Sequence, residues 1–358
     1  MHVVLSGYYG FDNVGDEAIL FSIVHALRKR QPDVKITVLS NNPTSTAQTY
    51  SVNAVNRWKL KEVSQMLKQA DGLISGGGSL MQDQTGMKSI PYYCGIIRIA
   101  KFHKKPVFVY AQGMGPINQK ISQLLVKNTF KKVEQITVRD EASKQLLADI
   151  GVNNSVAIVP DPVMGLDAEA FRSEWLSGQN FNNGYITVSV RDWPSAVPFK
   201  QKIADSLDLL VRDGKTIVFI PMHGEHDEKS SKELAALMQE AAIVAPGDLS
   251  IEEKIAVIGQ SDLLIGMRLH SLIFSAIQAT PFIALSYDPK IDAFADIAGQ
   301  PVIGHVEKDD WDGAQLFERA VEMLAERTTI EQALRVQVQT LQAEANATAK
   351  LALETFSK

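Results

Sequence analysis

Cationic side chains that can bind an anion follow three strand-like segments in the second half of the sequence. The segment "VSVR" ends at Arg191, "LLIGMRLHSL" carries Arg268 and His270, and "IALSYDPKI" presents Lys290. In the first half, Arg139 ends the segment "QITVR" in the same manner. The carboxyl ends of parallel strands meet at one edge of a sheet, so we expect the cations of the second half to converge there. A bidentate Arg contact with point charges from Lys and His suits a small, multiply charged anion.

The spacing of Arg268 and His270 is informative because an apolar helix begins at the same place. The N-terminus of a helix attracts anions and disfavours adjacent cations. Placing both groups there costs free energy unless a ligand compensates, so the pair favours an anion site. For any one of the cations alone, a surface position or a hydrogen bond at a helix end is the alternative interpretation.

A glycine-rich turn follows the first strand-like segment, in "HVVLSGYYGFDNVGDEAIL". The spacing of Gly7, Gly10 and Gly15 does not match the G-x-G-x-x-G fingerprint, and no acidic residue ends the second strand, so a nicotinamide enzyme is disfavoured. With Asn13 and Asp16, the turn offers backbone N–H groups and a carboxylate at a helix start. The alternative is that Asp16 only caps the helix and the glycines only turn the chain.

A second glycine turn, "GLISGGGSLMQD", follows another strand with Gly76, Gly77 and Gly78. Glycine has no Cβ, so a backbone built from it can approach a ligand closely. Asp83 lies just beyond this turn. Together the two turns predict one wall of a cleft for a hydroxyl-rich or phosphorylated group.

His223 and His226, in "PMHGEHD", have the spacing of a metal-binding pair. No cluster of further ligands accompanies them in the sequence, so we expect no metal and no other cofactor.

Short β-rich segments alternate with helix-period segments along almost the whole chain, which predicts an α/β protein with parallel sheets. We expect two doubly wound, Rossmann-like domains that face a cleft, followed by C-terminal helices. The domains are expected at 1–165 and 185–315, joined by a linker rich in Asn, Gly and Ser at 166–184 and followed by a helical segment at 316–358.

Composition limits the class of protein. The chain has 358 residues, 45% of them hydrophobic, and a net charge of −5, which does not favour a nucleic-acid binder. A single cysteine, Cys94, excludes internal disulfides and fits a reducing compartment. The longest apolar runs are far shorter than a membrane span, and the first residues lack the features of a signal peptide, so we expect a cytoplasmic protein.

Several motifs together resemble the polysaccharide pyruvyl transferase family: "GYYGFDNVGDEAIL", "ISGGGSLMQD", "VRDEAS", "DPV", "VSVR" and "GMRLHSLIFSAIQATPFIALSYDPKI". The sequence looks most like the bacterial branch that modifies secondary cell-wall polymers, the CsaB type. The resemblance implies a two-lobed architecture similar to that of GT-B glycosyltransferases and phosphoenolpyruvate as the donor. It also implies a pyruvyl ketal as the product, formed on a β-linked N-acetylmannosamine of a lipid-linked precursor and used to anchor S-layer proteins.

The resemblance and the chemistry of the residues suggest roles for both halves of the chain. Phosphoenolpyruvate carries a carboxylate and a phosphate, which we assign to Arg268 and Lys290, with Arg191 or Arg139 as further contacts. His270 is the candidate general acid; its alternative role is to donate a hydrogen bond to the phosphate. The first domain is expected to bind the acceptor, with Asp16 or Asp83 as the base and a wall formed by Gly10, Asn13, Gly15, Gly76, Gly77, Gly78 and Asp83.

Two other classes of protein stay open at this point. A glycosyltransferase that uses a nucleotide sugar would share the two lobes and use similar cations for a diphosphate. A two-lobed solute-binding protein would share the cleft, but such proteins are normally exported.

A lipid-linked acceptor also implies a peripheral contact with the inner face of the cell membrane. The basic runs "KFHKKP" and "KNTFKK" could face anionic head groups, although a solvated helix face is the alternative.

Overall fold

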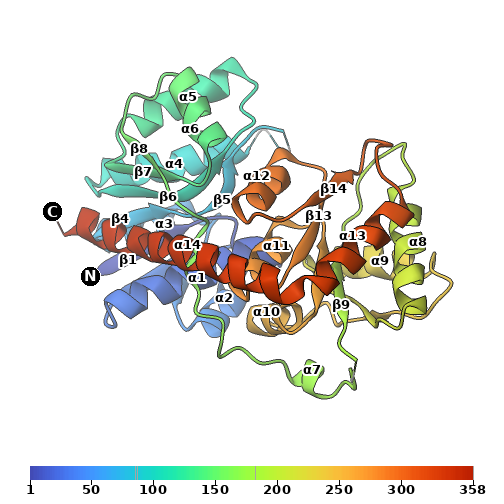
Figure 1. The fold of residues 1–358 in the computed structure, drawn as a ribbon. Helices are drawn as coiled ribbons and strands as arrows, with labels where there is room; N and C mark the ends of the chain where they lie inside the picture. The colour runs from blue at the N-terminus through green and yellow to red at the C-terminus, as the bar shows by residue number, and fades with distance from the viewer. Residues whose placement is uncertain (85, 87, 182, 358) are drawn as a thin grey trace. The chain divides into compact units, whose positions relative to one another are not determined.

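The computed structural model describes residues 1–84, 86, 88–181 and 183–357. The chain divides into two compact units, here called unit 1 (Met1–Leu166 with Leu341–Lys358) and unit 2 (Asp167–Thr340). The long last helix, α14 (Arg327–Phe356), contributes residues to both units (Figure 1). Over the described ranges, no helix combines the length and the apolar character that crossing a membrane requires.

Over its described residues, unit 1 is built on a sheet of eight strands whose order is β3-β2-β1-β4-β6-β7-β8, with β5 paired to β6. All the pairings are parallel, with Val3 opposite both Ile36 and Gly72. The strands are β1 (His2–Ser6), β2 (Lys35–Ser40), β3 (Asn53–Asn56), β4 (Gly72–Ser75), β5 (Gly78–Met81), β6 (Val107–Met114), β7 (Gln135–Val138) and β8 (Val156–Ile158). The helices are α1 (Val14–Arg30), α2 (Pro43–Tyr50), α3 (Leu60–Gln69), α4 (Ser89–Phe102), α5 (Lys120–Phe130), α6 (Glu141–Asp149) and the 3₁₀ helix η1 (Pro162–Gly165).

Unit 2 is built on a second parallel sheet, in which the described part of the chain forms six strands in the order β11-β10-β9-β12-β13-β14. The strands are β9 (Ile186–Ser189), β10 (Ile217–Phe219), β11 (Ile243–Val244), β12 (Leu263–Gly266), β13 (Phe282–Ser286) and β14 (Val302–His305). The helices before α14 are α7 (Glu174–Ser177), α8 (Phe199–Arg212), α9 (Gly224–Ala235), α10 (Ile251–Gly259), α11 (Leu269–Ile277), α12 (Pro289–Ile297) and α13 (Gly313–Ala325).

The central strands are buried on both faces. Every residue of β4, β6, β9, β12 and β13 is buried, as expected for parallel strands with helices on both sides. The unit 1 core includes Leu73 and Val109, and the unit 2 core includes Val188 and Ile265. The prediction of two doubly wound α/β units is therefore confirmed.

In both sheets the strand order reverses beside the first strand of the unit. β1 lies between β2 and β4, and β9 lies between β12 and β10. In sheets of this kind, ligands bind beyond the carboxyl ends of the strands at such a reversal. The fold therefore predicts that ligands bind at the segments that follow β1 and β4 in unit 1, and β9 and β12 in unit 2.

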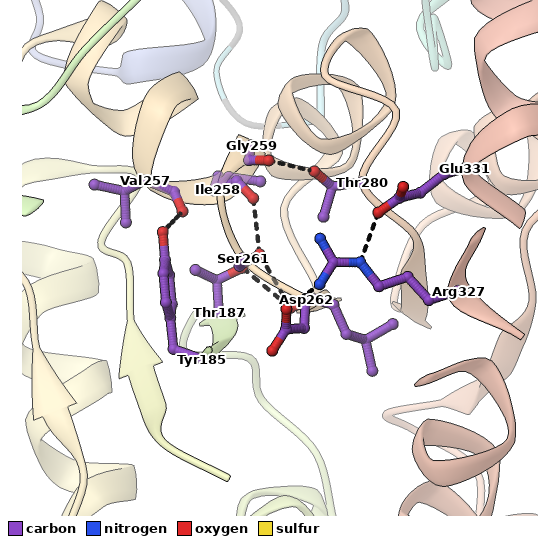
Figure 2. A network of polar contacts seen from close by, with 11 residues as sticks. Tyr185, Thr187, Val257, Ile258, Gly259, Ser261, Asp262, Thr280, Arg327 and Glu331 are labelled. Carbon is purple, nitrogen blue, oxygen red and sulfur yellow. Dashed lines mark hydrogen bonds and ion pairs between the residues drawn. The ribbon is translucent and has the colours of Figure 1, made fainter. Parts of the chain in front are cut away.

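The opposite, amino-terminal edge of the unit 2 sheet is closed by a network of polar contacts (Figure 2). The Tyr185 hydroxyl donates to the Val257 carbonyl at 2.6 Å, and the Ser261 hydroxyl donates to the Ile258 carbonyl at 2.7 Å. Arg327, at the start of α14, forms ion pairs with Asp262 and Glu331. These contacts fasten α10 and α14 to the sheet.

Candidate functional site

Four neighbouring strands of unit 2 carry polar side chains directly beyond their carboxyl ends. Arg191 follows β9, His223 follows β10, Arg268 follows β12, and Tyr287 with Lys290 follows β13. Because β10, β9, β12 and β13 are adjacent in the sheet, these residues share one edge. We call them, together with His270, the unit 2 cluster. The strand-end reasoning thus placed Arg191, Arg268, His270 and Lys290 on the same edge.

Arg268 is held by Asp227, a residue that the sequence analysis did not select. Arg268 is the N-cap of α11, and its Nε donates to Asp227 Oδ2 at 2.9 Å while its Nη2 pairs with Oδ1. The Asp227 side chain is 1% exposed and that of Arg268 is 16% exposed. Asp227 also accepts a hydrogen bond from the Met222 N–H at 3.2 Å, which fixes its carboxylate. This carboxylate supplies part of the compensation for a cation at a helix start that we had expected from a ligand.

Arg191 lies against two aromatic rings, Trp193 and Tyr287, that also contact each other. Its Nη1 donates to the Tyr287 hydroxyl at 3.0 Å, and its guanidinium carbon lies 4.7 Å from the Tyr287 ring and 5.1 Å from the Trp193 ring. Its Nε and the neighbouring Ser189 hydroxyl are buried and have no hydrogen-bond partner within the described part of the chain. Buried polar groups are nearly always paired, so these two atoms point to a ligand or water at this place.

Lys290 occupies the first turn of α12 and makes an ion pair with the N-cap residue, Asp288. The ammonium lies 2.9 Å from Asp288 Oδ2, and the Lys290 N–H donates to Oδ1 at 3.1 Å. It also lies 5.7 Å from the centre of the Tyr287 ring. An ion pair this close to solvent contributes little free energy, so it leaves the ammonium able to meet another anion.

The histidines of unit 2 differ in position. His270 lies in the first turn of α11, two residues after Arg268. His223 is the N-cap of α9; its pKa is lowered, first by burial and then by the positive charge of Arg268, with a smaller contribution from Arg191. The His223 and His226 rings are 5.3 Å apart. Over the described residues, no group of three or more His, Cys, Asp or Glu side chains has a metal-binding arrangement.

In unit 1, the turn after β1 is stabilised by hydrogen bonds to Glu17 as well as by the conformation of a glycine. Gly10 has φ +77°, and its N–H donates to Glu17 Oε1 at 2.7 Å, while the Tyr50 hydroxyl donates to Oε2 at 2.7 Å. Asn13 is the N-cap of α1, where its Oδ1 accepts from the Gly15 N–H at 3.1 Å. The capping role considered for Asp16 therefore belongs to Asn13.

The two glycine turns of unit 1 meet at Asp16. A Cβ added to Gly78, which has φ +86°, would lie 2.7 Å from Asp16 Oδ1. At Gly76 an added Cβ would lie 2.1 Å from the Tyr9 hydroxyl, and the Gly76 N–H donates to the Ser6 carbonyl at 2.7 Å. At Gly77 an added Cβ would lie 3.0 Å from Ile19 Cγ2, so Gly77 is less constrained than Gly76 and Gly78. Gly76 and Gly78 are required by these close approaches within unit 1.

Buried polar atoms gather at this edge of the unit 1 sheet. The Ser6 and Tyr9 hydroxyls and Gln112 Oε1 are buried without a hydrogen-bond partner in the ranges that the structure describes. Gln112 Nε2 donates to the Gly76 carbonyl at 3.2 Å, and the Tyr9 hydroxyl lies against Gly76, which places both side chains beside the second glycine turn. Unit 1 thus has its own candidate binding edge, at the carboxyl ends of β1, β4 and β6.

Asp83 and Arg139 also belong to unit 1. Asp83 accepts hydrogen bonds from the Asn118 and Gln119 N–H groups, both at 2.9 Å. Desolvation raises the pKa of Asp83, but these hydrogen bonds together outweigh that effect and the pKa is lowered. The largely buried Arg139 donates to the Ser79 hydroxyl at 2.9 Å and lies near Asp140 and Asp161, at 3.6 and 3.7 Å. Arg139 is therefore grouped with unit 1, whereas the other cations form the unit 2 cluster.

Solved structures show the class of fold. Over 99% of this chain and 97% of the other, it is similar to a glycosyltransferase from Rickettsia africae with a TM-score of 0.68 and 13% identity. The Anabaena HepE protein in complex with UDP gives a TM-score of 0.68 over 100% of both chains at 11% identity. A UDP-GlcNAc 2-epimerase from Neisseria meningitidis bound to UDP-GlcNAc gives 0.63 over 99% of both chains at 11% identity.

The sequence itself shows the family. Residues 13–289 match the model of the polysaccharide pyruvyl transferase family. The amylovoran biosynthesis protein AmsJ of Erwinia amylovora is 21% identical over 81% of this chain and 84% of that protein. The chain belongs to the polysaccharide pyruvyl transferase family, and its general activity is the transfer of pyruvyl groups to polysaccharide.

Proposed function

We propose that this protein transfers a pyruvyl group from phosphoenolpyruvate to two hydroxyls of one polysaccharide sugar, forming a ketal and releasing phosphate. The observation that carries this proposal is the unit 2 cluster, in which Arg191, Arg268 and Lys290 lie beyond adjacent strands. The buried Nε of Arg191, which has no partner in the described ranges, supports an anion at this edge. A carboxylate and a phosphate on one small molecule match this concentration of positive charge.

Three cations of the cluster have a part in binding the donor. Arg268, oriented by Asp227, presents a fixed guanidinium to one anionic group of phosphoenolpyruvate. Arg191, fixed against Tyr287, contacts the other anionic group, and Lys290 exchanges its exposed ion pair with Asp288 for the ligand. Arg139, which the structure groups with unit 1, remains the candidate for a further anion contact.

The chemistry requires balanced proton transfer. One sugar hydroxyl adds to C2 of phosphoenolpyruvate while C3 receives a proton, for which His270 is the general acid. Expulsion of phosphate from C2 then allows the second hydroxyl to add and close the ketal. Of the two hydroxyl protons, one replaces the proton given to C3 and the other leaves with phosphate, so the reaction needs no oxidant or reductant.

The acceptor is assigned to unit 1. Asp16, which lies against Gly78 between the two glycine turns, is our candidate for the base that receives the proton of the attacking hydroxyl. Asp83 is a weaker candidate because its pKa is lowered and it already holds the Asn118 and Gln119 N–H groups. We assign the wall of Gly10, Asn13, Gly15 and Gly76 to Gly78 to the acceptor through its backbone groups, because Tyr9 and Asp16 already occupy the space beside Gly76 and Gly78.

The motif resemblance supports a narrower assignment. We propose that the acceptor is a β-linked N-acetylmannosamine on a lipid-linked precursor, modified at the inner face of the cell membrane and later used to anchor S-layer proteins. The relative AmsJ takes its name from another polymer, amylovoran, so acceptors with more than one kind of terminal sugar are tested. No metal or other cofactor is assigned to the reaction.

Ligand binding distinguishes the two enzyme classes. Thermal unfolding is measured with phosphoenolpyruvate and, separately, with UDP, because the solved structure of HepE contains UDP. The proposal predicts stabilisation by phosphoenolpyruvate that is lost in Arg191→Ala and kept in the control Arg319→Ala, an exposed arginine on α13 of the same unit. Stabilisation by UDP alone would instead support a glycosyltransferase.

A further inference from the structure

Unit 1 exposes aromatic rings beside its glycine turns. Trp58, after β3, is 59% exposed, and Tyr8, in the turn after β1, is 41% exposed. The Tyr8 ring is stacked on that of Phe11, with centroids 4.1 Å apart and planes within 6°. Exposed aromatic surface gathered at one place marks a binding site more often than a scattered single residue does. We call Tyr8, Phe11 and Trp58 the aromatic platform.

A buried arginine, Arg57, packs against two rings of the platform. Arg57 is 3% exposed, and its guanidinium carbon lies 5.2 Å from the Phe11 ring and 5.1 Å from the Trp58 ring. Its Nη1 donates to the Gly7 carbonyl at 2.8 Å and its Nη2 to the Tyr93 hydroxyl at 3.2 Å. The sequence analysis missed Arg57 because nothing local distinguishes it from a surface arginine. Its cation holds the rings around it in fixed places.

The Trp58 ring is fixed in orientation as well as in place. Its Nε1 donates to Asn41 Oδ1 at 3.0 Å, and its ring lies 5.4 Å from that of Tyr92. The Tyr92 hydroxyl in turn donates to the Arg57 carbonyl at 3.2 Å. A ring that is both exposed and immobilised loses little entropy when a ligand stacks on it.

The surroundings of the platform indicate a neutral ligand. The turn after β1 carries Asp12, and the first turn of α1 carries Asp16 and Glu17. These carboxylates repel phosphate, and the amide of Asn41 offers hydrogen bonds to hydroxyls. The face of an aromatic ring is slightly negative and attracts the slightly positive C–H bonds of a pyranose face. A sugar ring, with an apolar face and a hydroxyl rim, fits both conditions.

Tyr8 lies in the turn after β1, near the candidate base Asp16, whereas Trp58 follows β3. β3 and β1 are separated by β2, so the end of β3 is two strand spacings from that of β1, about 10 Å. That distance exceeds the width of one pyranose. We propose that Trp58 forms a stacking subsite for the sugar next to the one that receives the pyruvyl group. The assignment rests on the proposed function and means that the enzyme recognises at least a disaccharide.

Binding is measured without turnover. Of the four tryptophans, Trp58 is the one in unit 1, and the others are Trp175, Trp193 and Trp311, so stacking changes a component of the intrinsic fluorescence that Trp58→Phe removes. The probes are the methyl β-glycoside of N-acetylmannosamine and lipid-free disaccharides that end in N-acetylmannosamine or galactose. Calorimetric titration of each variant gives the Kd for the same probes.

The expected result is a loss that depends on the second sugar. Trp58→Ala weakens disaccharide binding about tenfold, equivalent to about 1.4 kcal/mol, and leaves monosaccharide binding unchanged. Trp58→Phe keeps a stacking ring and stays within about threefold of the parent, an effect of about 0.65 kcal/mol. The control Phe102→Ala removes another exposed aromatic of unit 1, 81% exposed on α4, and changes neither Kd.

The subsite would be overturned if Trp58→Ala lost affinity equally for the monosaccharide and the disaccharide, or lost none. It would also be overturned if the parent protein bound neither disaccharide. Binding of uridine that depends on Trp58 would also overturn it, because the ring would then stack on a base. Phosphate release from phosphoenolpyruvate separates the two proposals. Normal release with unaltered KM for the disaccharide in Trp58→Ala refutes the subsite alone, whereas tenfold weaker disaccharide binding without any phosphate release refutes the proposed function alone.

Discussion

Replacement of Asp227 with Asn tests whether this carboxylate positions Arg268 for the donor. The substitution keeps the size of the side chain and removes the charge that binds Nε and Nη2 of Arg268. A hydrogen bond to a charged group contributes about 1.5–3 kcal/mol, and breaking a fully buried ion pair costs about 3–5 kcal/mol. Because Arg268 is 16% exposed and water can reach it, the lower range applies. We expect Asp227→Asn to lose about 1.5–3 kcal/mol of interaction free energy with Arg268.

The assay separates positioning from stability. If the guanidinium loses its orientation, kcat/KM for phosphoenolpyruvate falls about 10- to 100-fold, mostly through KM, as measured by phosphate release. Asp208→Asn is the matched control: Asp208 is also buried in unit 2, but it accepts hydrogen bonds from the backbone N–H groups of Gln239 and Glu240. Both variants lower the free energy of unfolding, and only Asp227→Asn raises KM. An unchanged KM in Asp227→Asn would refute the positioning role.

Three further predictions follow from single residues. His270→Ala lowers kcat about 10²- to 10⁴-fold in steady-state assays and leaves acceptor Kd unchanged; turnover close to that of the parent would exclude proton transfer by His270. Gly78 has φ +86°, and a Cβ added there would lie 2.7 Å from Asp16 Oδ1. Gly78→Ala therefore lowers the free energy of unfolding of unit 1 by at least about 1 kcal/mol in denaturant unfolding and raises the KM for the acceptor. Unchanged values would show that the backbone adapts freely. The pKa of His223 is lower in the folded than in the unfolded state, so its contribution to stability is complete above about pH 6.5 and is lost as pH falls through the folded pKa. His223→Gln therefore reduces the pH dependence of the free energy of unfolding between about pH 5 and 7. The same pH dependence in the variant and the parent would contradict the assignment.

The α/β fold was predictable because parallel strands leave a strong local signal. Segments such as "VFVYAQGM" in β6 are apolar on both faces, and helix-period segments separate them, so hydrophobicity alone identifies the layers. The end of the chain shows the limit of this reasoning. The segment after Asp310 is continuously helix-forming in sequence, but α13 ends at Ala325 and α14 brings Phe356 back against Gly72 in unit 1. A contact between residues so far apart in sequence leaves no local pattern.

The candidate site was predictable where the fold alone decides position. Arg191, Arg268 and Lys290 follow strands, and strand ends share an edge whatever their side chains do. The partners of these residues were not predictable, because they depend on how a neighbouring helix is rotated. Asp227 looks like an ordinary acidic residue in the first turn of α9, and only the folded chain places it against Arg268.

The central claim concerns the donor and the product, and one measurement tests both. Phosphate release from phosphoenolpyruvate is followed with and without a synthetic lipid-linked disaccharide that ends in N-acetylmannosamine, and with its galactose counterpart, and the product mass is then determined. Our account predicts phosphate release that depends on an acceptor and a product heavier by one pyruvyl ketal. Absence of phosphate release with every acceptor, together with stabilisation of the protein by a nucleoside diphosphate, would contradict it.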